Sequence, residues 1–274
     1  MQISIHPLKQ NDHMKITILG AGNMGGAIAC GLAVSGGLQP QDITVIDHKG
    51  KNVPRLREVS EDINVVVADY SSLLTADILI IAVKPWMVEE VLKTHKALLE
   101  NPKQLIVSVA AVVTLAQLQE WTSPRQPVFR VVPNTAIAVR QSMTYIASQN
   151  ADKEQREQVF RIFSQLGKVE FVEEKLIPAI TSLTSCGIAF AFRYIRAAME
   201  GGIEMGVYPD QAKDAVLQTL RGAIDLLEAN GNHPEAEIDK VTTAGGITIK
   251  GLNEMEHAGF TSAVIKGLKA SNIK

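Results

Sequence analysis

The feature that most constrains the fold is a glycine motif near the start of the chain, Gly20-Ala-Gly-Asn-Met-Gly25. It follows the apolar run Ile16–Leu19 and opens a small-residue stretch in which Met24, Ile28 and Leu32 lie four apart on one helix face. Three glycines in this spacing, between a strand and a helix, are typical of a dinucleotide-binding βαβ unit. The motif therefore predicts that the chain binds a dinucleotide, and the alternative is an ordinary glycine-rich turn.

Each glycine of the motif has its own physical role. Gly20 permits a tight turn, Gly22 lets the backbone approach a pyrophosphate, and Gly25 lets helix and strand pack closely. The free N–H groups at the start of the helix then face the phosphates. We therefore predict cofactor contacts along the whole loop: Gly20, Ala21, Gly22, Asn23, Met24 and Gly25.

Strand-like and helix-like segments alternate through the first half of the chain. Strands are predicted at 16–19, 43–46, 65–67, 78–83, 105–109 and 128–132, and several of them are apolar without alternation, as expected for parallel strands covered on both faces. A further strand pair is predicted at 143–146 and 169–172. Helices are predicted at 24–34, 54–59, 87–99, 115–120 and 153–166. This order predicts an α/β fold with an N-terminal Rossmann-type doubly wound parallel sheet, followed by an all-α domain.

Helical periodicity takes over near Glu173. We predict a dinucleotide-binding domain over residues 14–172 and a helical dimerisation and substrate domain over 173–274, with 1–13 an extension or tag remnant. Residues 177–199 are apolar on almost every face, and a helix of that kind must be buried. Because few other helices can surround it, we predict burial against a second subunit; packing within the chain is the alternative.

Composition excludes several classes of protein. The chain has 274 residues and a net charge of −2, so no basic surplus indicates nucleic acid. We expect no apolar run to reach the roughly 18 residues that cross a membrane, and the polar N-terminus lacks a signal peptide's apolar stretch. Cys30 and Cys186 lie in apolar helical contexts that fit a reducing cytoplasm, and no His or Cys spacing predicts a metal site.

The second predicted strand ends in an acidic residue, Asp47, which lies 22 residues after Gly25. A carboxylate in this place accepts hydrogen bonds from the adenosine ribose and favours NAD. His48, Lys49 and Lys51 follow at once and are able to hold the 2′-phosphate of NADP, unless they only form a solvated loop. The sequence therefore predicts cofactor contacts at Asp47 and His48 and leaves NAD and NADP both open.

Two further strand ends belong to the same crevice, because the carboxyl ends of parallel strands line it. One is Ala82-Val83-Lys84-Pro85, where the proline holds the loop rigid and Lys84 is a candidate phosphate or ribose contact, unless it is only a solvated loop charge. The other includes Ala110, whose small side chain lets a flat nicotinamide ring lie against the backbone. We predict cofactor contacts at all five residues.

Four motifs make this chain resemble the pyrroline-5-carboxylate reductases: Gly20-Ala-Gly-Asn-Met-Gly25, Ala82-Val-Lys-Pro85, Arg130-Val-Val-Pro-Asn-Thr135 and Thr242-Thr-Ala-Gly-Gly-Ile-Thr248. The resemblance covers nearly everything from Met14 onward. It implies hydride transfer from NADPH or NADH to the C=N carbon of Δ1-pyrroline-5-carboxylate, giving L-proline, the last step of proline biosynthesis. It also implies a homodimer through the helical domain, and leaves open a decamer of such dimers.

The resemblance also assigns residues. It implies that Thr243, Gly245, Gly246 and Ile247 bind the substrate carboxylate and that Thr248 is catalytic, orienting or protonating the ring nitrogen. Two glycines in succession are able to turn N–H groups inward as an anion nest. The resemblance further implies cofactor contacts at Asp69, where the family usually has Asn, and at Asn134.

Several positions depart from the family pattern. Ala244 and Ala136 replace prolines, Val112 replaces a glycine, and the helix opening reads Ser185-Cys-Gly-Ile-Ala189. These departures keep two other readings open: a reductase of another small imino or keto acid, and a non-catalytic nucleotide-sensing dimer.

Overall fold

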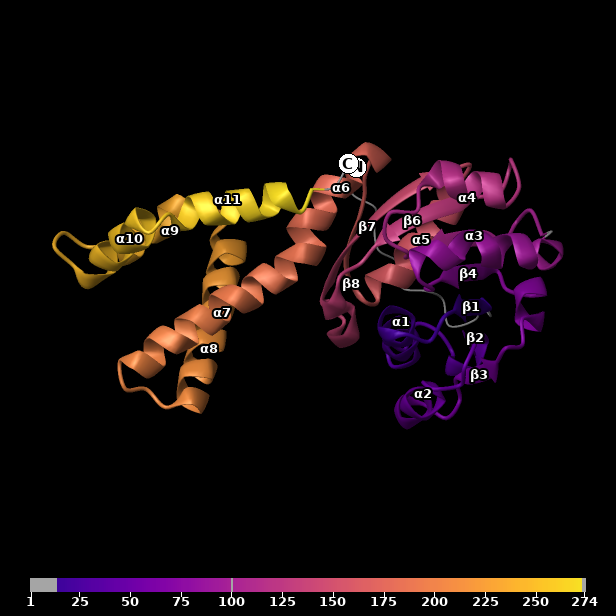
Figure 1. The fold of residues 1–274 in the computed structure, drawn as a ribbon, viewed down its shortest axis with the longest axis horizontal. Coiled ribbons are helices and arrows are strands. Elements are labelled where there is room, and N and C mark those ends of the chain that lie inside the picture. The colour runs from indigo at the N-terminus through magenta and orange to yellow at the C-terminus, as the bar shows by residue number, and fades with distance from the viewer. Residues whose placement is uncertain (1–13, 100, 273–274) are drawn as a thin grey trace. The chain divides into compact units, whose positions relative to one another are not determined.

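The computed structural model describes residues 14–99 and 101–272, so the predicted extension at 1–13 lies outside the described residues. The chain forms two compact units that divide between Ser185 and Cys186 (Figure 1).

The first unit is built on one eight-stranded sheet. Its strands are β1 (Ile16–Leu19), β2 (Ile43–Asp47), β3 (Asn64–Val67), β4 (Ile78–Ile81), β5 (Leu105–Ser108), β6 (Val128–Val132), β7 (Ser142–Gln149) and β8 (Gly167–Phe171). They lie in the order β3-β2-β1-β4-β5-β6-β7-β8. The first six are parallel, β7 is antiparallel to β6, and β8 is parallel to β7. The order 3-2-1-4-5-6 is that of a dinucleotide-binding fold, which confirms the predicted class.

Helices cover both faces of this sheet, around two buried clusters. On one face lie α1 (Asn23–Ala33), α2 (Val53–Val59) and α5 (Lys153–Ser164), which contribute Ile28, Leu56 and Phe163 to the core. On the other lie α3 (Pro85–Thr94) and α4 (Leu115–Trp121), which contribute Leu92 and Leu118 (Figure 1). Strands buried on both faces explain why their sequences are apolar without alternation.

The sheet reverses its direction of winding between β1 and β4, which are direct neighbours. The Gly20 N–H donates to the Ile46 carbonyl at 3.0 Å, and the Ala82 N–H donates to the Leu19 carbonyl at 2.9 Å. The glycine loop after β1 therefore continues the ladder between the ends of β2 and β4. Ligands of such sheets bind at this reversal, outside the carboxyl ends of the strands.

The first unit ends in a 3-10 turn at Glu174–Leu176, α6 (Ile177–Ile180) and all but the last residue of a π-helical segment at Thr181–Cys186. The hydroxyls of Thr181, Ser182 and Thr184 each donate to the carbonyl four residues earlier. Hydroxyls bonded in this way loosen and bend a helix. This wide π turn spans the boundary between the two units, with only Cys186 in the second.

The second unit is entirely helical in its described part. It contains α7 (Gly187–Glu204), α8 (Pro209–Asn230), α9 (Pro234–Val241), α10 (Ile247–His257) and α11 (Phe260–Ala270). Gly202 of α7 packs on Ala212 of α8, and the Tyr194 ring meets the Phe260 ring edge-on at 6.4 Å. Among the described residues of this unit, only Ala212 is buried. This unit therefore has almost no core of its own.

Large apolar side chains are exposed throughout the second unit instead. They are Phe190, Phe192, Tyr194, Ile203, Met205, Val207, Tyr208, Ile224, Leu226, Val241, Ile247, Met255, Phe260, Val264 and Ile265. An apolar surface of this extent marks an interaction site. The apolar helix predicted at 177–199 is present as α6, the π turn and most of α7. Most side chains of α7 are exposed to solvent in the single chain.

Candidate functional site

The glycine loop at the end of β1 is sterically defined at two of its three glycines. Gly20 has φ +107°, and a Cβ built there would lie 2.9 Å from the Ala82 carbonyl oxygen. A Cβ on Gly25 would lie only 1.9 Å from the Gly20 carbonyl oxygen. Both positions therefore require glycine for the protein's own packing.

Gly22 is different, because the protein does not explain why it is glycine. Its φ is −64°, which any residue adopts, and a Cβ there would have no atom within 4 Å. Gly22 is exposed and is the N-cap of α1, and no side chain caps this helix. Open space in front of uncapped helical N–H groups fits a bound phosphate. The loop thus fits the pyrophosphate of a dinucleotide.

The end of β2 places Asp47 in the fold with its side chain already bonded. The residue is 7% exposed. One carboxylate oxygen accepts the Lys49 N–H at 3.2 Å, and the other accepts the Asn52 backbone N–H at 2.8 Å and side-chain Nδ2 at 3.3 Å. His48 and Lys49 are exposed beside it. The Asp47 carboxylate therefore stabilises the loop that follows it, through its hydrogen bonds to Lys49 and Asn52.

Beside it, the end of β3 carries Asp69 and Tyr70. Ala68 has φ +51°, and the Asp69 carboxylate accepts the Ser71 N–H at 2.9 Å, which lowers the pKa of Asp69. Tyr70 stacks on the His95 ring at 3.9 Å, and its hydroxyl lies 3.4 Å from Nδ1 of His48. Burial lowers the pKa of His95. No pattern in the sequence indicates this aromatic pair.

The ends of β4 and β5 carry the next predicted contacts. Lys84 is the exposed N-cap of α3 and Pro85 is its first residue, so proline begins the helix as expected. Ala110 is buried, and its N–H donates to the Ser108 hydroxyl at 3.3 Å. Val112 has φ +64° and is 68% exposed. A β-branched residue in this conformation is strained, and such strain clusters at functional sites.

Residues of the Arg130–Thr135 motif bond to the segment that follows β8. Asn134 is 6% exposed; its Oδ1 accepts the Ala136 N–H, and its Nδ2 donates to the Thr184 carbonyl at 3.4 Å. The Ser185 hydroxyl donates to the Pro133 carbonyl at 3.2 Å. The side-chain amide of Asn134 thus contacts the chain near the unit boundary, and no bond links it to the glycine loop in the described residues.

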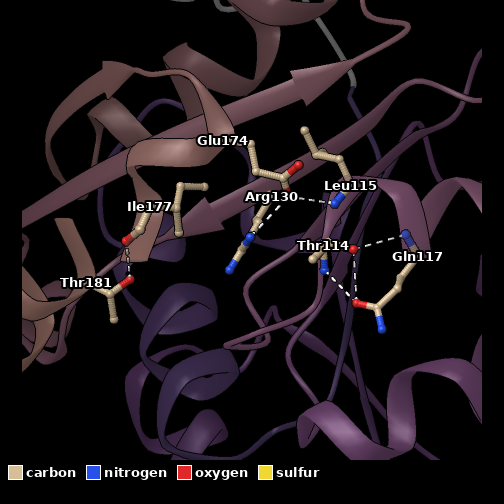
Figure 2. Close-up of polar contacts among 7 residues, drawn as sticks. All are labelled: Thr114, Leu115, Gln117, Arg130, Glu174, Ile177 and Thr181. Atoms are coloured by element: carbon tan, nitrogen blue, oxygen red, sulfur yellow. Dashed lines mark hydrogen bonds and ion pairs between the residues drawn. The ribbon is translucent and has the colours of Figure 1, made fainter. Parts of the chain in front are cut away.

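Glu174 fastens the same segment to the sheet (Figure 2). Its Oε1 accepts from Arg130 Nη1 at 3.1 Å and from the Leu115 N–H at 2.8 Å, at the start of α4. Thr114 and Gln117 close that helix start as a reciprocal capping box. No sequence pattern indicated Glu174, because its partners lie 44 and 59 residues away. A cavity of about 490 Å³ next to Glu174 is lined by Arg156 and Phe171 and contains none of the predicted site residues.

The second unit carries the predicted substrate segment as a tight turn before α10. The Gly246 N–H donates to the Thr243 carbonyl at 2.9 Å, and Gly245 has φ +72°. Gly246 is the N-cap of α10, and no side chain caps this helix. The N–H of Gly246 is thus used inside the turn, and the donors open to an anion are those of the first helical residues, Ile247 and Thr248. Both side chains are exposed.

Comparisons with known proteins agree with these two parts. Residues 15–112 match the family model "NADP oxidoreductase coenzyme F420-dependent", and residues 174–274 match "Pyrroline-5-carboxylate reductase dimerisation". A Dictyostelium discoideum protein named pyrroline-5-carboxylate reductase 2 is 35% identical over 96% of this chain and 92% of its own length.

The chain belongs to the pyrroline-5-carboxylate reductase family. A second Dictyostelium relative, pyrroline-5-carboxylate reductase 1, is 37% identical over 94% of this chain, which spans 49% of that relative's length. A solved structure of a pyrroline-5-carboxylate reductase from Coxiella burnetii has a TM-score of 0.86 at 27% identity, covering 95% of this chain and 96% of that one. The resemblance predicted from the four motifs is confirmed.

As a pyrroline-5-carboxylate reductase family member, the chain carries an oligomerisation domain at its C-terminal end. One helical stretch, 174–204, is long and apolar enough to cross a membrane by length and composition alone, with a mean hydropathy of 1.4. This corrects the expectation that no stretch reaches that length. The stretch lies inside the dimerisation match, and a helix buried between subunits has the same composition. The described residues contain no group of three or more metal-ligating side chains.

Proposed function

We propose that this chain reduces Δ1-pyrroline-5-carboxylate to L-proline with NADPH or NADH, the last step of proline biosynthesis. The observation that carries the proposal is that this member of the family has both a dinucleotide loop with unfilled space at Gly22 and an uncapped start of α10 at Ile247, directly after the turn that begins at Thr243. The first suits a nicotinamide cofactor and the second suits a small carboxylate.

The chain's residues bind and orient the cofactor, which supplies the hydride when bound. The proposed contacts follow the ends of the strands along one edge of the sheet. They are Gly20, Ala21, Gly22, Asn23, Met24, Gly25, Asp47, His48, Asp69, Ala82, Val83, Lys84, Pro85, Ala110 and Asn134. Asn134 acts through the 3-10 turn that it caps, since its side-chain amide is bonded within the protein.

The substrate carboxylate binds at the start of α10. The N–H groups of Ile247 and Thr248 point out of the helix end and attract an anion, and the exposed Thr243 hydroxyl adds a donor. Gly245 and Gly246 form the turn that brings Thr243 beside this helix start. The Thr248 hydroxyl orients or protonates the imine nitrogen as hydride reaches the neighbouring carbon.

The protein acts as a homodimer, or as a decamer of dimers, through residues 173–274. The nearly absent core and the exposed apolar side chains of the second unit support a second copy of this chain as the missing packing partner. We place residues 14–172 as the dinucleotide-binding domain. The proposal includes no membrane and no nucleic acid, and a cytoplasmic location is supported by two free cysteines.

The test is oxidation of NADPH and NADH with Δ1-pyrroline-5-carboxylate by the wild type and two Thr248 variants. Thr248→Ala should lower kcat by about 10- to 1000-fold, in the range of a lost acid–base contribution, and Thr248→Ser should restore most of it. An unchanged kcat in Thr248→Ala would remove this residue from the mechanism. No turnover by the wild type with either cofactor would contradict the proposed function.

A further inference from the structure

We propose that Glu174 is a positioning residue for hydride transfer, because it holds the loop after β5 and the end of β6 in place and, through them, the nicotinamide end of the cofactor. Glu174 lies outside the four motifs of the sequence, and in this role it acts through the backbone that it holds. The inference rests on the proposed function for the cofactor contacts at Ala110 and Asn134, which follow these two strands.

A single carboxylate oxygen of Glu174 joins three parts of the first unit. Arg130 Nη1 donates to Oε1 at 3.1 Å, and the Leu115 N–H donates to the same oxygen at 2.8 Å (Figure 2). Arg130 lies on β6, Leu115 is the first residue of α4, and Glu174 itself follows β8. Arg130 is also the register partner of Ser108, the last residue of β5. Glu174 is thus bonded directly to both chain segments that carry the proposed contacts.

The ion pair between Glu174 and Arg130 is largely buried, with 31% and 11% of the two side chains exposed. Removing one member of a buried pair leaves the charge of the other uncompensated. Nε of Arg130 is buried and has no hydrogen-bond partner among the described residues, so this nitrogen gives Arg130 no second anchor. Without Glu174, Arg130 has to turn toward another acceptor, and the end of β6 moves with it.

The loop between β5 and α4 requires an anchor because it contains a strained residue. Val112 has φ +64°, a conformation that a β-branched residue keeps only where its surroundings impose it. At the start of the loop, the Ala110 N–H donates to the Ser108 hydroxyl at 3.3 Å. At its end, the capping box of α4 leaves the Leu115 N–H to Glu174. Release of this end lets Val112 relax and displaces the backbone at Ala110.

Such a displacement affects the rate of the reaction more than the affinity for the cofactor. Hydride transfer needs the reacting atoms about 3–3.5 Å apart, and a misplacement of about 1 Å costs up to about 100-fold in rate. The glycine loop after β1, in contrast, bonds to the ends of β2 and β4 and has no bond to Glu174 among the described residues. Loss of Glu174 should therefore lower kcat and leave the dissociation constant of NADPH nearly unchanged.

The experiment compares three variants of Glu174 by their kcat with Δ1-pyrroline-5-carboxylate, expressed per NADPH-binding site. Sites are titrated by energy transfer from tryptophan to the reduced nicotinamide, since Trp86 is 77% exposed and follows Pro85 at the start of α3. Glu174→Ala removes the acceptor, and Glu174→Asp keeps the charge on a side chain one methylene shorter. Both should lower kcat about 10- to 100-fold, with the dissociation constant of NADPH within about threefold of the wild type. Glu174→Gln keeps an acceptor oxygen in place and should retain kcat within about fivefold.

The matched control is Glu157→Ala, which removes an ion pair of similar exposure, Arg161–Glu157 on α5. Its kcat per site should equal that of the wild type. A second measurement needs no substrate: the fluorescence anisotropy of the bound reduced nicotinamide should fall in Glu174→Ala and Glu174→Asp, because the ring is held less firmly, and should persist in Glu174→Gln.

Wild-type kcat and anisotropy in Glu174→Ala and Glu174→Asp would overturn the proposal and leave Glu174 a role in stability alone. If Glu174→Ala does not fold, Glu174→Asp decides the question. A loss in Glu174→Gln as large as in Glu174→Asp would also overturn it, because charge and not the held geometry would then be responsible, and so would an equal loss in Glu157→Ala. Absence of turnover by the wild type would contradict the proposed function, and the anisotropy would still decide the role of Glu174.

Discussion

The two glycines Gly22 and Gly25 should respond in opposite ways to the same substitution, alanine. In Gly25→Ala the new Cβ lies 1.9 Å from the Gly20 carbonyl oxygen and 2.9 Å from the Ala82 side chain, so the backbone must move. Overpacking of this kind costs about 3 kcal/mol, and Tm should fall by about 10 °C. In Gly22→Ala the Cβ meets nothing within 4 Å at a φ of −64°.

For Gly22→Ala we therefore expect a free energy of unfolding within about 1 kcal/mol of the wild type, because the lower chain entropy offsets the poorer N-cap. Its NADPH affinity should nevertheless fall about 100-fold, since the methyl group occupies the space of the pyrophosphate and separates it from the N–H groups of α1. Losing two charge-assisted bonds accounts for about 3 kcal/mol. The assay pairs ligand-free thermal melts with NADPH titrations by tryptophan energy transfer. If Gly22→Ala kept wild-type affinity, the open space at Gly22 would not be the phosphate site.

Three further results follow from the structure. Val112→Gly should raise the free energy of unfolding by about 0.5–1 kcal/mol in a denaturant titration, because relief of the strained φ of +64° exceeds the entropy cost of glycine; a loss of stability would show that Val112 is not strained. Burial lowers the pKa of His95 below its usual value of 6.5, so just below pH 6.5 the unfolded chain binds more protons than the folded one. The stability of the wild type therefore falls as the pH drops through that window. His95→Phe should make the stability depend less on pH there. If stability depended on pH in the same way in His95→Phe as in the wild type, His95 would not be the group responsible. Gly246→Ala places a Cβ 2.6 Å from the Thr243 hydroxyl and should raise KM for the substrate about tenfold, with cofactor affinity unchanged. Gly251→Ala, which has open space around it, is the control. A normal KM in Gly246→Ala would refute the assignment of this turn to substrate binding.

The fold was predictable because its signals are local. Each strand of the parallel sheet is a short apolar run, and the glycine motif identifies where β1 meets α1, so the predicted strands and helices agree with the observed ones to within a few residues. Differences arise at the ends: the predicted helix at 87–99 starts earlier, at Pro85, and stops at Thr94, with a separate 3-10 turn following at Lys96–Leu98. Proline sets the first position, and no periodicity marks the change to a 3-10 turn.

The candidate site was predictable only at positions where the spacing of a motif allows a single residue type for a steric reason. Gly20 and Gly25 have steric roles that spacing identifies, but the side-chain bonds of Asp47 depend on how residues 48–52 fold back, which no spacing shows. Glu174 illustrates the same limit, because it joins β6 to the start of α4 through partners far away in sequence. Val112 stands out in the sequence because the family usually has glycine there. Only the structure shows the reason, which is a backbone φ of +64° that strains a β-branched residue.

The central claim is that this chain transfers a hydride to the imine carbon of Δ1-pyrroline-5-carboxylate, and the most direct test follows that hydride. The enzyme is supplied with NADPH carrying deuterium on both faces of nicotinamide C4, and the product is analysed by NMR and mass spectrometry. We predict L-proline with one deuterium on the ring carbon that was the imine carbon, across the nitrogen from the carboxylate-bearing carbon. Unlabelled proline, or deuterium on the carboxylate-bearing carbon, would contradict the account.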